Sequence, residues 1–367
     1  MSALFEPLRL RGLELPNRIW LSPMCQYSAG ADGVPADWHL VHLGARITGG
    51  FGLVLTESTA VSPQGRISAA DVGLWSAEQI DGWRRITDFA HAHGTAIGVQ
   101  LGHAGRKAST KVPGLGRGSL PPEEGGWTAL APSATAYRGF ATPVAASATD
   151  LDRIVADFAS ATERAIRAGF DVVEIHAGHG YLLHQFLSPL ANHRTDAYGG
   201  SFENRIRLLM RVVDAVRTTW PGDRPLLVRI PATDWVDGGW SPEESVELAV
   251  RLAGRGADLL DVTTGGLDPD QRIPVGPGYQ VPFARRVRAA VPGVAVSAVG
   301  LITDPEQAEA VLERGDADVV LLAREALRDP SWPLRAMARL APRRLTESYP
   351  WQYGRAVPAP STVDMTK

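Results

Sequence analysis

Residues 170–187 read FDVVEIHAGHGYLLHQFL, and this stretch shows the unit from which the chain is built. The apolar residues 170–174 are typical of a buried strand, and residues 182–187 predict the start of a helix. Two imidazoles and one phenol leave the strand end together, bracketed by glycines: His176, His179 and Tyr181. They offer hydrogen-bond donors for a polarised oxygen, with a phenolic proton donor beside them. A buried histidine packed among aromatic residues is the structural alternative, but three such groups in six positions favour a functional site.

The same strand-and-helix unit recurs along the whole chain. Short apolar runs alternate with longer helical patterns, and nearly continuous apolar runs suit strands that are buried on both faces. Eight runs predict strands: 18–21, 52–56, 97–101, 171–176, 226–230, 259–263, 295–299 and 318–322. This alternation predicts an α/β fold, a (β/α)8 TIM barrel. A doubly wound sheet is the alternative, but no Gly-x-Gly-x-x-Gly follows the first strand.

Capping residues mark several helix boundaries. Thr149 with Asp152 predicts the start of a helix that ends at Gly169. Three further residues are expected to be N-caps, because a capping-box residue or a first-turn proline follows each of them: Ser76, Ser241 and Asp304.

One segment interrupts the regular spacing of strands and helices. Residues 111–148 are rich in Gly, Pro, Ser and Ala and follow the third strand. We expect a capping excursion or lid over the mouth of the barrel, with a disordered insertion as the alternative. Residues 1–355 are expected to form a single barrel domain, and residues 356–367 a flexible C-terminal tail.

Composition excludes several classes of protein. The chain has 367 residues, a net charge of -3 and 44% hydrophobic residues, which is normal for a globular protein and predicts no nucleic-acid partner. No apolar stretch approaches ~20 residues, so we expect no membrane span. The start of the chain does not resemble a signal peptide. The single cysteine, Cys25, excludes an intrachain disulfide, and a reducing cytoplasm is the simplest location.

Further chemistry is expected at the carboxyl ends of the strands, where barrels of this kind carry their active sites. Arg229 lies in the apolar run 226–230, where an unpaired charge would be very costly, so it must meet an anion or a strong acceptor. A structural ion pair with an acid from another strand is the alternative. Gly300 and Arg324 follow the seventh and eighth strands, where loops often bind phosphate.

Two other kinds of site are less well supported. His176 and His179 lack the His-Glu-x-x-His spacing of a helical zinc site, and no clear third ligand follows, although His184 and His193 are available. We therefore expect no metal. No Gly-x-Ser-x-Gly elbow supports a serine hydrolase.

A series of motifs covers the chain to about Arg355. The motifs are Leu4-Phe5-Glu6-Pro7-Leu8, Pro23-Met24-Cys25-Gln26-Tyr27, Gln100-Leu101-x-His103-Ala104-Gly105-Arg106-Lys107, His176-x-x-His179-Gly180-Tyr181 and Arg194-Thr195-Asp196-x-Tyr198-Gly199-Gly200. Together they resemble one known family, the old yellow enzymes. Cys25, Tyr27 and the ending Gln352-Tyr353-x-Arg355 resemble its thermophilic-like subgroup.

The resemblance implies noncovalent FMN, reduction by NADPH or NADH, and ping-pong hydride transfer to activated alkenes such as enones, enals and maleimides. His176 and His179 would hold the substrate carbonyl, Tyr27 would add a contact, and Tyr181 would protonate the α-carbon. Cys25 would tune the flavin. The implied cofactor-binding residues are Ser22, Pro23, Met24, Cys25, Ser58, Gln100, Arg229, Gly300, Ala323 and Arg324.

The resemblance also implies a homodimer or homotetramer in which Arg355 reaches the site of a neighbouring subunit. The sequence departs from the family pattern at Ser58, where many members have Ala, and at Ala323, where Gly is usual. Two alternatives remain open. One is a flavin reductase of nitro compounds, nitrate esters or quinones. The other is a flavin-free, phosphate-binding aldolase or isomerase with Lys107 as a Schiff-base lysine; otherwise Lys107 has no assigned role.

Overall fold

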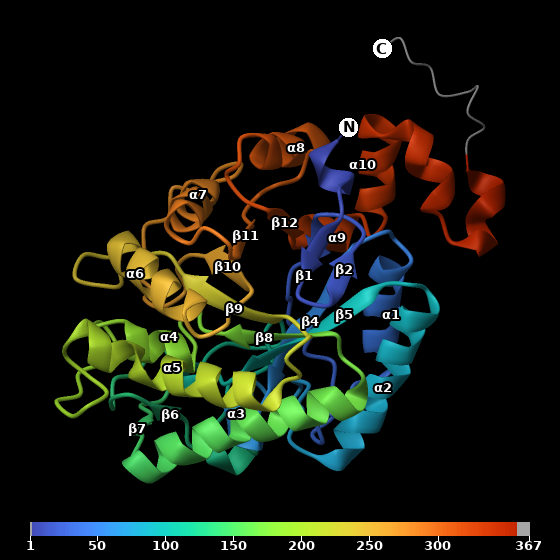
Figure 1. Ribbon diagram of the computed structural model, residues 1–367. Coiled ribbons are helices and arrows are strands. Elements are labelled where there is room, and N and C mark those ends of the chain that lie inside the picture. The colour runs from blue at the N-terminus through green and yellow to red at the C-terminus, as the bar shows by residue number, and fades with distance from the viewer. Residues whose placement is uncertain (1, 358–367) are drawn as a thin grey trace.

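The chain folds around a closed barrel of parallel strands, as the sequence predicts. The computed structural model describes residues 2–357. Figure 1 shows the strands at the centre and the helices around them. The barrel strands are β3 (Ile19–Leu21), β4 (Leu53–Ala60), β5 (Ala96–Gly102), β8 (Val172–His176), β9 (Leu226–Pro231), β10 (Leu259–Thr263), β11 (Ala295–Ala298) and β12 (Val319–Leu322). Each pairs in parallel with its neighbour, and β12 pairs with β3 to close the ring. The TIM-barrel prediction is confirmed.

The helices cover the outside of the barrel, and most of the predicted caps are present. The helices are α1 (Asp37–Ile47), α2 (Ala77–Ala92), α3 (Ala148–Ala168), α4 (Leu182–Leu187), α5 (Phe202–Thr219), α6 (Pro242–Ala253), α7 (Val281–Ala290), α8 (Pro305–Glu313), α9 (Arg324–Arg328) and α10 (Trp332–Leu340). Ser76, Ser241 and Asp304 are N-caps, as predicted.

The predicted start of α3 is wrong by two residues. The N-cap is Ser147, whose Oγ accepts from the backbone N of Asp150, while an Asp150 carboxylate oxygen accepts from the backbone N of Ser147 at 2.9 Å. This reciprocal pair satisfies two free N–H groups before Thr149 is reached. The predicted end is correct, because Gly169 caps the helix with φ 88°.

A short hairpin closes the amino end of the barrel, which the sequence did not predict. Strands β1 (Leu8–Leu10) and β2 (Leu13–Leu15) pair antiparallel. Leu10 and Leu15 are buried in one apolar cluster with the side chains that fill the lower barrel, among them Trp20 and Leu227. The barrel interior is therefore a packed core at this end.

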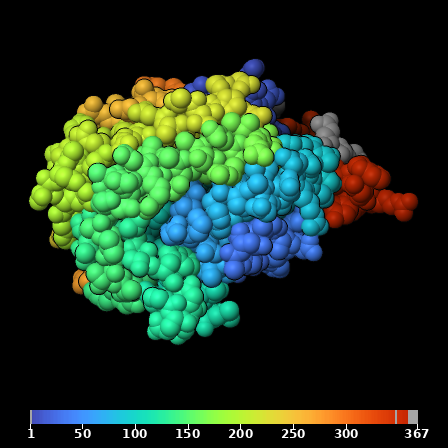
Figure 2. All heavy atoms as spheres, turned by 90° about the horizontal axis from the view of Figure 1, so that it is seen from below, coloured from blue at the N-terminus to red at the C-terminus, as the bar shows by residue number. Residues whose placement is uncertain are grey.

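The segment 111–148 is ordered and carries two short strands, β6 (Leu130–Ala131) and β7 (Val144–Ala145). Trp127 anchors it: the backbone N donates to Ser109 Oγ at 2.8 Å and the indole N–H to the carbonyl of Gln64 at 2.9 Å. Figure 2 shows part of the segment as a teal-green lobe that projects from the body. The prediction of a capping excursion is confirmed, and the disordered alternative is wrong.

The described part of the chain ends in two short 3-10 helices, η5 (Pro342–Glu347) and η6 (Trp351–Ala356), which lie outside the barrel in Figure 1. Trp351 and Tyr353 are 86% and 56% exposed. Residues 358–367, most of the predicted tail, lie outside the described residues. Across residues 2–357, no helix combines the length and apolar character needed to cross a membrane.

Candidate functional site

The carboxyl ends of the parallel strands share one rim, and the predicted site residues gather there. A cavity of about 300 Å³ opens at this rim. Its walls include seven of those residues: Ser22, Pro23, His179, Arg229, Gly300, Ala323 and Arg324. Gln100 lies inside β5 and His176 at the end of β8. Arg355 is the exception, because it lies on exposed η6.

His176, His179 and Tyr181 form one compact cluster. The ring centroid of His176 lies 5.2 Å from those of both His179 and Tyr181, with edge-on geometry. His176 Nε2 lies 3.4 Å from His179 Nδ1. The backbone turns sharply here, with φ 55° at His179 and φ 71° at Gly180, where a Cβ would collide with the carbonyl of Gly266. Glycine at position 180 therefore allows the imidazoles and the phenol to face one another.

Neighbouring groups determine which ring nitrogens can donate. The backbone N of Gly178 donates to His176 Nδ1 at 3.3 Å, which leaves the proton of a neutral His176 on Nε2. Burial, followed by the charge of Arg229, lowers the pKa of both histidines well below the usual value, so both are neutral at pH 7. Thr263 Oγ1 lies 2.9 Å from His179 Nε2. The Thr263 hydroxyl also donates to Gln280 Oε1 at 3.3 Å, so it can accept from His179 Nε2; a hydroxyl that donates to His179 instead would place the His179 proton on Nδ1, beside His176 Nε2.

Tyr181 shares an apolar corner of the site with Cys25 and Tyr27. These three half-buried residues pack on a small cluster that includes Ala104 and Ala129. Burial raises the pKa of Tyr181 well above its usual value, with the negative forms of Cys25 and Tyr27 opposing ionisation further. Burial, then the Glu57 carboxylate, raises the pKa of the Cys25 thiol. Phenol and thiol both keep their protons at neutral pH.

Lys107 joins two loops of the rim. Its ammonium donates to the carbonyl of His179 at 2.9 Å and to the carbonyl of Gly266. The Nζ also lies 4.6 Å from the ring centroid of Tyr137, in the capping segment, and 5.5 Å from that of Tyr181. Burial, then the charge of Arg106, lowers the pKa of Lys107 to about 7. Lys107 thus holds the loop that carries His179, which the sequence did not indicate.

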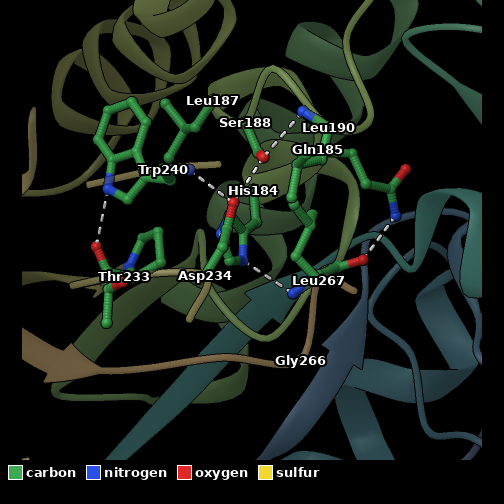
Figure 3. Close-up of polar contacts among 12 residues, drawn as sticks. His184, Gln185, Leu187, Ser188, Leu190, Thr233, Asp234, Trp240, Gly266 and Leu267 are labelled. Atoms are coloured by element: carbon green, nitrogen blue, oxygen red, sulfur yellow. Dashed lines mark hydrogen bonds and ion pairs between the residues drawn. The ribbon is translucent and has the colours of Figure 1, made fainter. Parts of the chain in front are cut away.

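A buried pair, His184 and Asp234, fixes the same loop from behind (Figure 3). His184 Nε2 lies 2.8 Å from an Asp234 carboxylate oxygen, and both side chains are fully buried. The other carboxylate oxygen accepts from Ser188 Oγ at 2.6 Å and from the backbone N of Trp240 at 2.7 Å. His184 Nδ1 accepts from the backbone N of Gly180 at 2.9 Å. The pair therefore fixes the backbone between His179 and Tyr181.

The ion-pair alternative for Arg229 is correct, because an acid from the next strand meets it. Arg229 Nε lies 3.0 Å from an Asp261 carboxylate oxygen, with the side chains 4% and 0% exposed. Arg229 also donates to Ser22 Oγ at 3.2 Å. Arg229 also lines the cavity, so its guanidinium can pair with Asp261 and still bind a further acceptor inside the cavity. A signal for this partner exists in the sequence, since Asp261 interrupts an apolar strand as Arg229 does.

A second acid missed in the sequence is Glu174, in β8. It is fully buried, and one of its carboxylate oxygens accepts from Gln100 Nε2 at 2.7 Å. This bond orients the Gln100 amide, so that its own oxygen is directed away from Glu174.

An apolar pocket of about 460 Å³ adjoins the histidine cluster and is formed largely by the capping segment. Its walls include Lys107, Tyr137, Phe140 and Tyr181. A flat apolar molecule placed here would lie beside the phenol of Tyr181. The excursion after the third strand thus shapes the site, although its sequence alone did not indicate how.

The far end of the 300 Å³ cavity is suited to a phosphate group. Gly300 has φ 120°, and a Cβ there would come within 2.8 Å of Gln280 Nε2. Gln280 cannot easily move, because it accepts from Thr264 Oγ1 at 2.8 Å and donates to the carbonyl of Val299 at 3.1 Å. The bare backbone at Gly300 and the guanidinium of Arg324 lie on the same cavity wall.

The described part of the chain contains no group of three or more His, Cys, Asp or Glu side chains arranged to bind a metal. His184 is engaged with Asp234, and His193 Nε2 lies 3.3 Å from the carbonyl of Leu190.

Comparison with known proteins gives consistent matches over nearly the whole chain. A model of the NADH:flavin oxidoreductase / NADH oxidase family matches residues 3–342. An NADH:flavin oxidoreductase of Gibberella zeae is 48% identical over 344 residues, 89% of this chain and 83% of its own length. An NADPH dehydrogenase of Geobacillus thermodenitrificans is 46% identical over 341 residues, 92% of this chain and 95% of its own.

Solved structures agree with these matches. Morphinone reductase superposes with a TM-score of 0.78 at 32% identity, covering 93% of this chain and 90% of its own. The old yellow enzyme homologue from Zymomonas mobilis gives a TM-score of 0.77 at 28% identity, covering 92% and 93%. These matches identify FMN as the cofactor and NAD(P)H as the reductant. The buried guanidinium of Arg229, the bare backbone at Gly300 and the charge of Arg324 fit a flavin ring and a phosphate along one cavity.

Proposed function

Because the chain belongs to the NADH:flavin oxidoreductase / NADH oxidase family, that of the old yellow enzymes, we propose that it is an ene-reductase that reduces activated alkenes. Its substrates would be enones, enals and maleimides. The observation that carries this proposal is the pair of neutral imidazoles, His176 and His179, whose ring nitrogens Nε2 and Nδ1 lie 3.4 Å apart beside the Tyr181 phenol.

The cavity residues would hold noncovalent FMN in a defined orientation. Ser22, Pro23, Met24, Cys25, Ser58, Gln100 and Arg229 would line the isoalloxazine ring. Gly300, Ala323 and Arg324 would bind the phosphate. The Arg229 guanidinium would stabilise negative charge on the pyrimidine side of the ring. The Gln100 oxygen, freed by the bond from Gln100 Nε2 to Glu174, would accept from a ring N–H.

The chain supplies binding and proton transfer, whereas bound FMN supplies the hydride that reaches the β-carbon. His176 Nε2–H and His179 Nδ1–H donate to the carbonyl oxygen of the substrate and withdraw electron density from the conjugated double bond. Tyr27 adds a contact to the same carbonyl. The Tyr181 phenol gives its proton to the α-carbon, and its raised pKa keeps that proton available at neutral pH.

The reductant and the alkene would use the same histidine pair in turn. NAD(P)H would bind first and leave oxidised before the alkene enters, which gives ping-pong kinetics. The pocket of about 460 Å³ beside Tyr181 would then bind the alkene body, since its walls include Phe140 and Tyr137.

Arg355 would act in a neighbouring subunit of a homodimer or homotetramer. Within its own chain it is exposed on η6, in the segment that lies outside the barrel in Figure 1. Trp351 and Tyr353 are exposed beside it, as expected for residues covered by a partner. An Arg355→Ala variant should bind substrate more weakly with an unchanged oligomeric state. Unchanged substrate affinity would remove Arg355 from the site.

The two alternative functions, a reductase of nitro compounds, nitrate esters or quinones and a Schiff-base aldolase or isomerase, fit the site unequally. A nitro group, nitrate ester or quinone presents oxygens that the same imidazoles can hold, so these compounds are the second candidate substrate class. A Schiff-base role for Lys107 has little support, because its amine is engaged by two backbone carbonyls.

One experiment tests the proposal directly. The purified enzyme is reduced anaerobically with NADPH, which should bleach the flavin, and is then mixed with an enone, a maleimide or a nitro compound. Reoxidation fastest with the enone or maleimide supports the proposal. Reoxidation by the nitro compound alone would contradict it. A double variant, His176→Ala with His179→Ala, should lose reoxidation by the enone.

A further inference from the structure

The upper layer of the barrel interior contains two carboxyl groups and one cation. Glu174, Arg229 and Asp261 come from the adjacent strands β8, β9 and β10. Arg229 lies opposite Asp261 in the strand register, and all three side chains are buried. Each carboxyl has one oxygen bonded to a neutral donor, Gln100 Nε2 for Glu174 and Ser297 Oγ for Asp261. The other oxygen of Glu174 has no hydrogen-bond partner, whereas the other oxygen of Asp261 faces Arg229 Nε at 3.0 Å in an ion pair without the geometry of a hydrogen bond.

One guanidinium cannot neutralise two buried carboxylates. If both acids were ionised, the cluster would carry a net negative charge with no solvent to screen it, which is very costly. Asp261 lies 3.0 Å from Arg229 Nε, so it is the carboxylate that the guanidinium stabilises. Glu174 is bonded only to a neutral amide. The proton that the pair must retain is therefore held on Glu174.

We propose that Glu174 is a proton-holding, positioning residue: protonated at neutral pH, it keeps the layer beneath the flavin without net charge, and in alkaline solution it takes up a proton when the flavin is reduced. This inference rests on the proposed location of FMN beside Arg229. The inference gives the barrel interior a role in the redox chemistry, namely to hold and take up a proton. The residues of the cavity wall do not have this role.

The surroundings of Glu174 contain no other group that could hold this proton. The charged groups that face it are Arg229 and Asp261. On its own strand, His176 is kept neutral by burial and by Arg229. Glu57, the remaining acid of the barrel strands, is engaged elsewhere, by the backbone N of Gln26 and by His39. The other buried residues on the remaining strands do not titrate: Trp20, Leu55, Gln100, Ser297 and Leu321. Burial, then the charge of Asp261, raises the pKa of Glu174 to about 8.

The proton and electron balance requires nothing beyond the established reductant. NAD(P)H breaks one C–H bond and transfers a hydride, which is two electrons with one proton, and the nicotinamide leaves oxidised. A flavin held beside Arg229 would gain one negative charge in this step. Above a pH of about 8, Glu174 of the oxidised enzyme is ionised, and one proton from solvent binds to it in response.

The first test detects the proton itself in the oxidised holoenzyme. With ¹³C-labelled glutamate carboxyl groups, infrared spectra at pH 7 should contain an isotope-sensitive band of a protonated carboxylic acid, which is lost as the pH rises through about 8. Glu174→Gln should lack the band. Asp261→Asn should lack the band too. Without the Asp261 carboxylate, the positive charge of Arg229 would stabilise the ionised form of Glu174. An absent band in the unaltered enzyme, or a band that persists in Glu174→Gln, would overturn the proposal.

The second test counts protons. The pH dependence of the flavin midpoint potential gives the protons taken up per two electrons. This number should rise from one toward two above a pH of about 8 in the unaltered enzyme and stay at one in Glu174→Gln. Identical slopes would overturn the coupling. If enones are reduced but the band is absent, only this inference fails; if the band is present but no alkene is reduced, only the ene-reductase proposal fails.

Discussion

Thr263 Oγ1 lies 2.9 Å from His179 Nε2, so a threonine at the end of β10 controls a histidine from the loop after β8. The same hydroxyl also donates to Gln280 Oε1 at 3.3 Å, an oxygen that accepts from Thr264 Oγ1 at 2.8 Å as well. The contact with His179 is the shorter of the two, and we expect the Thr263 proton to be donated there when substrate is bound. The His179 proton is then on Nδ1, beside His176 Nε2, where a substrate oxygen can receive both N–H groups.

A Thr263→Val substitution should weaken this arrangement while preserving the shape of the side chain. His179 would be free to place its proton on Nε2, and one donor to the substrate would be lost. A lost hydrogen bond of about 1.4 kcal/mol corresponds to roughly a tenfold increase in KM for an enone. Thr263→Ser, which keeps the hydroxyl, is the control. Equal KM values for the valine and serine variants would contradict the assigned tautomer.

A Tyr181→Phe substitution should separate the two half-reactions. The phenylalanine keeps the contact with His176 but has no proton to give. General-acid catalysis contributes about 10²–10⁴-fold, so reoxidation by an enone should slow by that order. Flavin reduction by NADPH should be nearly unchanged, as stopped-flow absorbance can show. Because the pKa of Tyr181 lies well above 10, the reoxidation rate should not fall through loss of this proton between a pH of about 6 and 9.

Lys107 should act through the loops it joins. Lys107→Met keeps the length of the side chain but removes the donor to the carbonyls of His179 and Gly266. We expect kcat for enones to fall by at least about tenfold, because the hydrogen bonds to both carbonyls are lost, whereas Lys107→Arg should retain more activity. An unchanged kcat in Lys107→Met would show that the two loops hold their positions without it.

The pKa of Lys107 also predicts a pH dependence of stability. It is lowered to about 7 in the fold, whereas an unfolded lysine titrates near ~10.4. Between these values the unfolded chain binds the extra proton, so this residue makes the fold more stable as the pH rises from about 7. Urea denaturation of Lys107→Met should lack that rise. Parallel pH profiles for the two proteins would contradict the shifted pKa.

Asp234→Asn should destabilise the fold, because it leaves His184, Ser188 and the Trp240 backbone N without their shared carboxylate. A loss of about 3 kcal/mol in the free energy of unfolding is expected for a broken buried pair. Asp237→Asn, exposed in the same loop, is the matched control. The pKa of Asp234 is lowered by its partners, so its contribution is present above the unfolded pKa of about 3.9 and is lost as the pH falls through the folded value.

Cys25 is the only cysteine of the chain, so thiol labelling reports on it alone. Its raised pKa keeps it as a thiol, and the reactive species is the thiolate. Labelling by iodoacetamide should be slow at pH 7 and accelerate with pH. Glu57→Gln should accelerate it at pH 7, because the Glu57 carboxylate opposes thiolate formation. An exposed glutamate, changed in Glu78→Gln, should leave the rate unaltered.

The sequence by itself determined the features that depend on neighbouring residues. Continuous apolar runs indicated each barrel strand, capping side chains indicated most helix starts, and glycine at position 180 allowed the turn between His179 and Tyr181. These features follow local rules of burial and backbone geometry, so they can be inferred without knowing what packs against them.

Only the tertiary structure decided which groups meet. Asp261 meets Arg229 because β9 and β10 pair in one register, and a shift by one residue would turn the two charges to opposite faces. The hairpin that closes the barrel, the contact of Lys107 with Gly266, and the His184–Asp234 pair join residues far apart in the chain. Such partners are set by strand order and register, which no local pattern of residues contains.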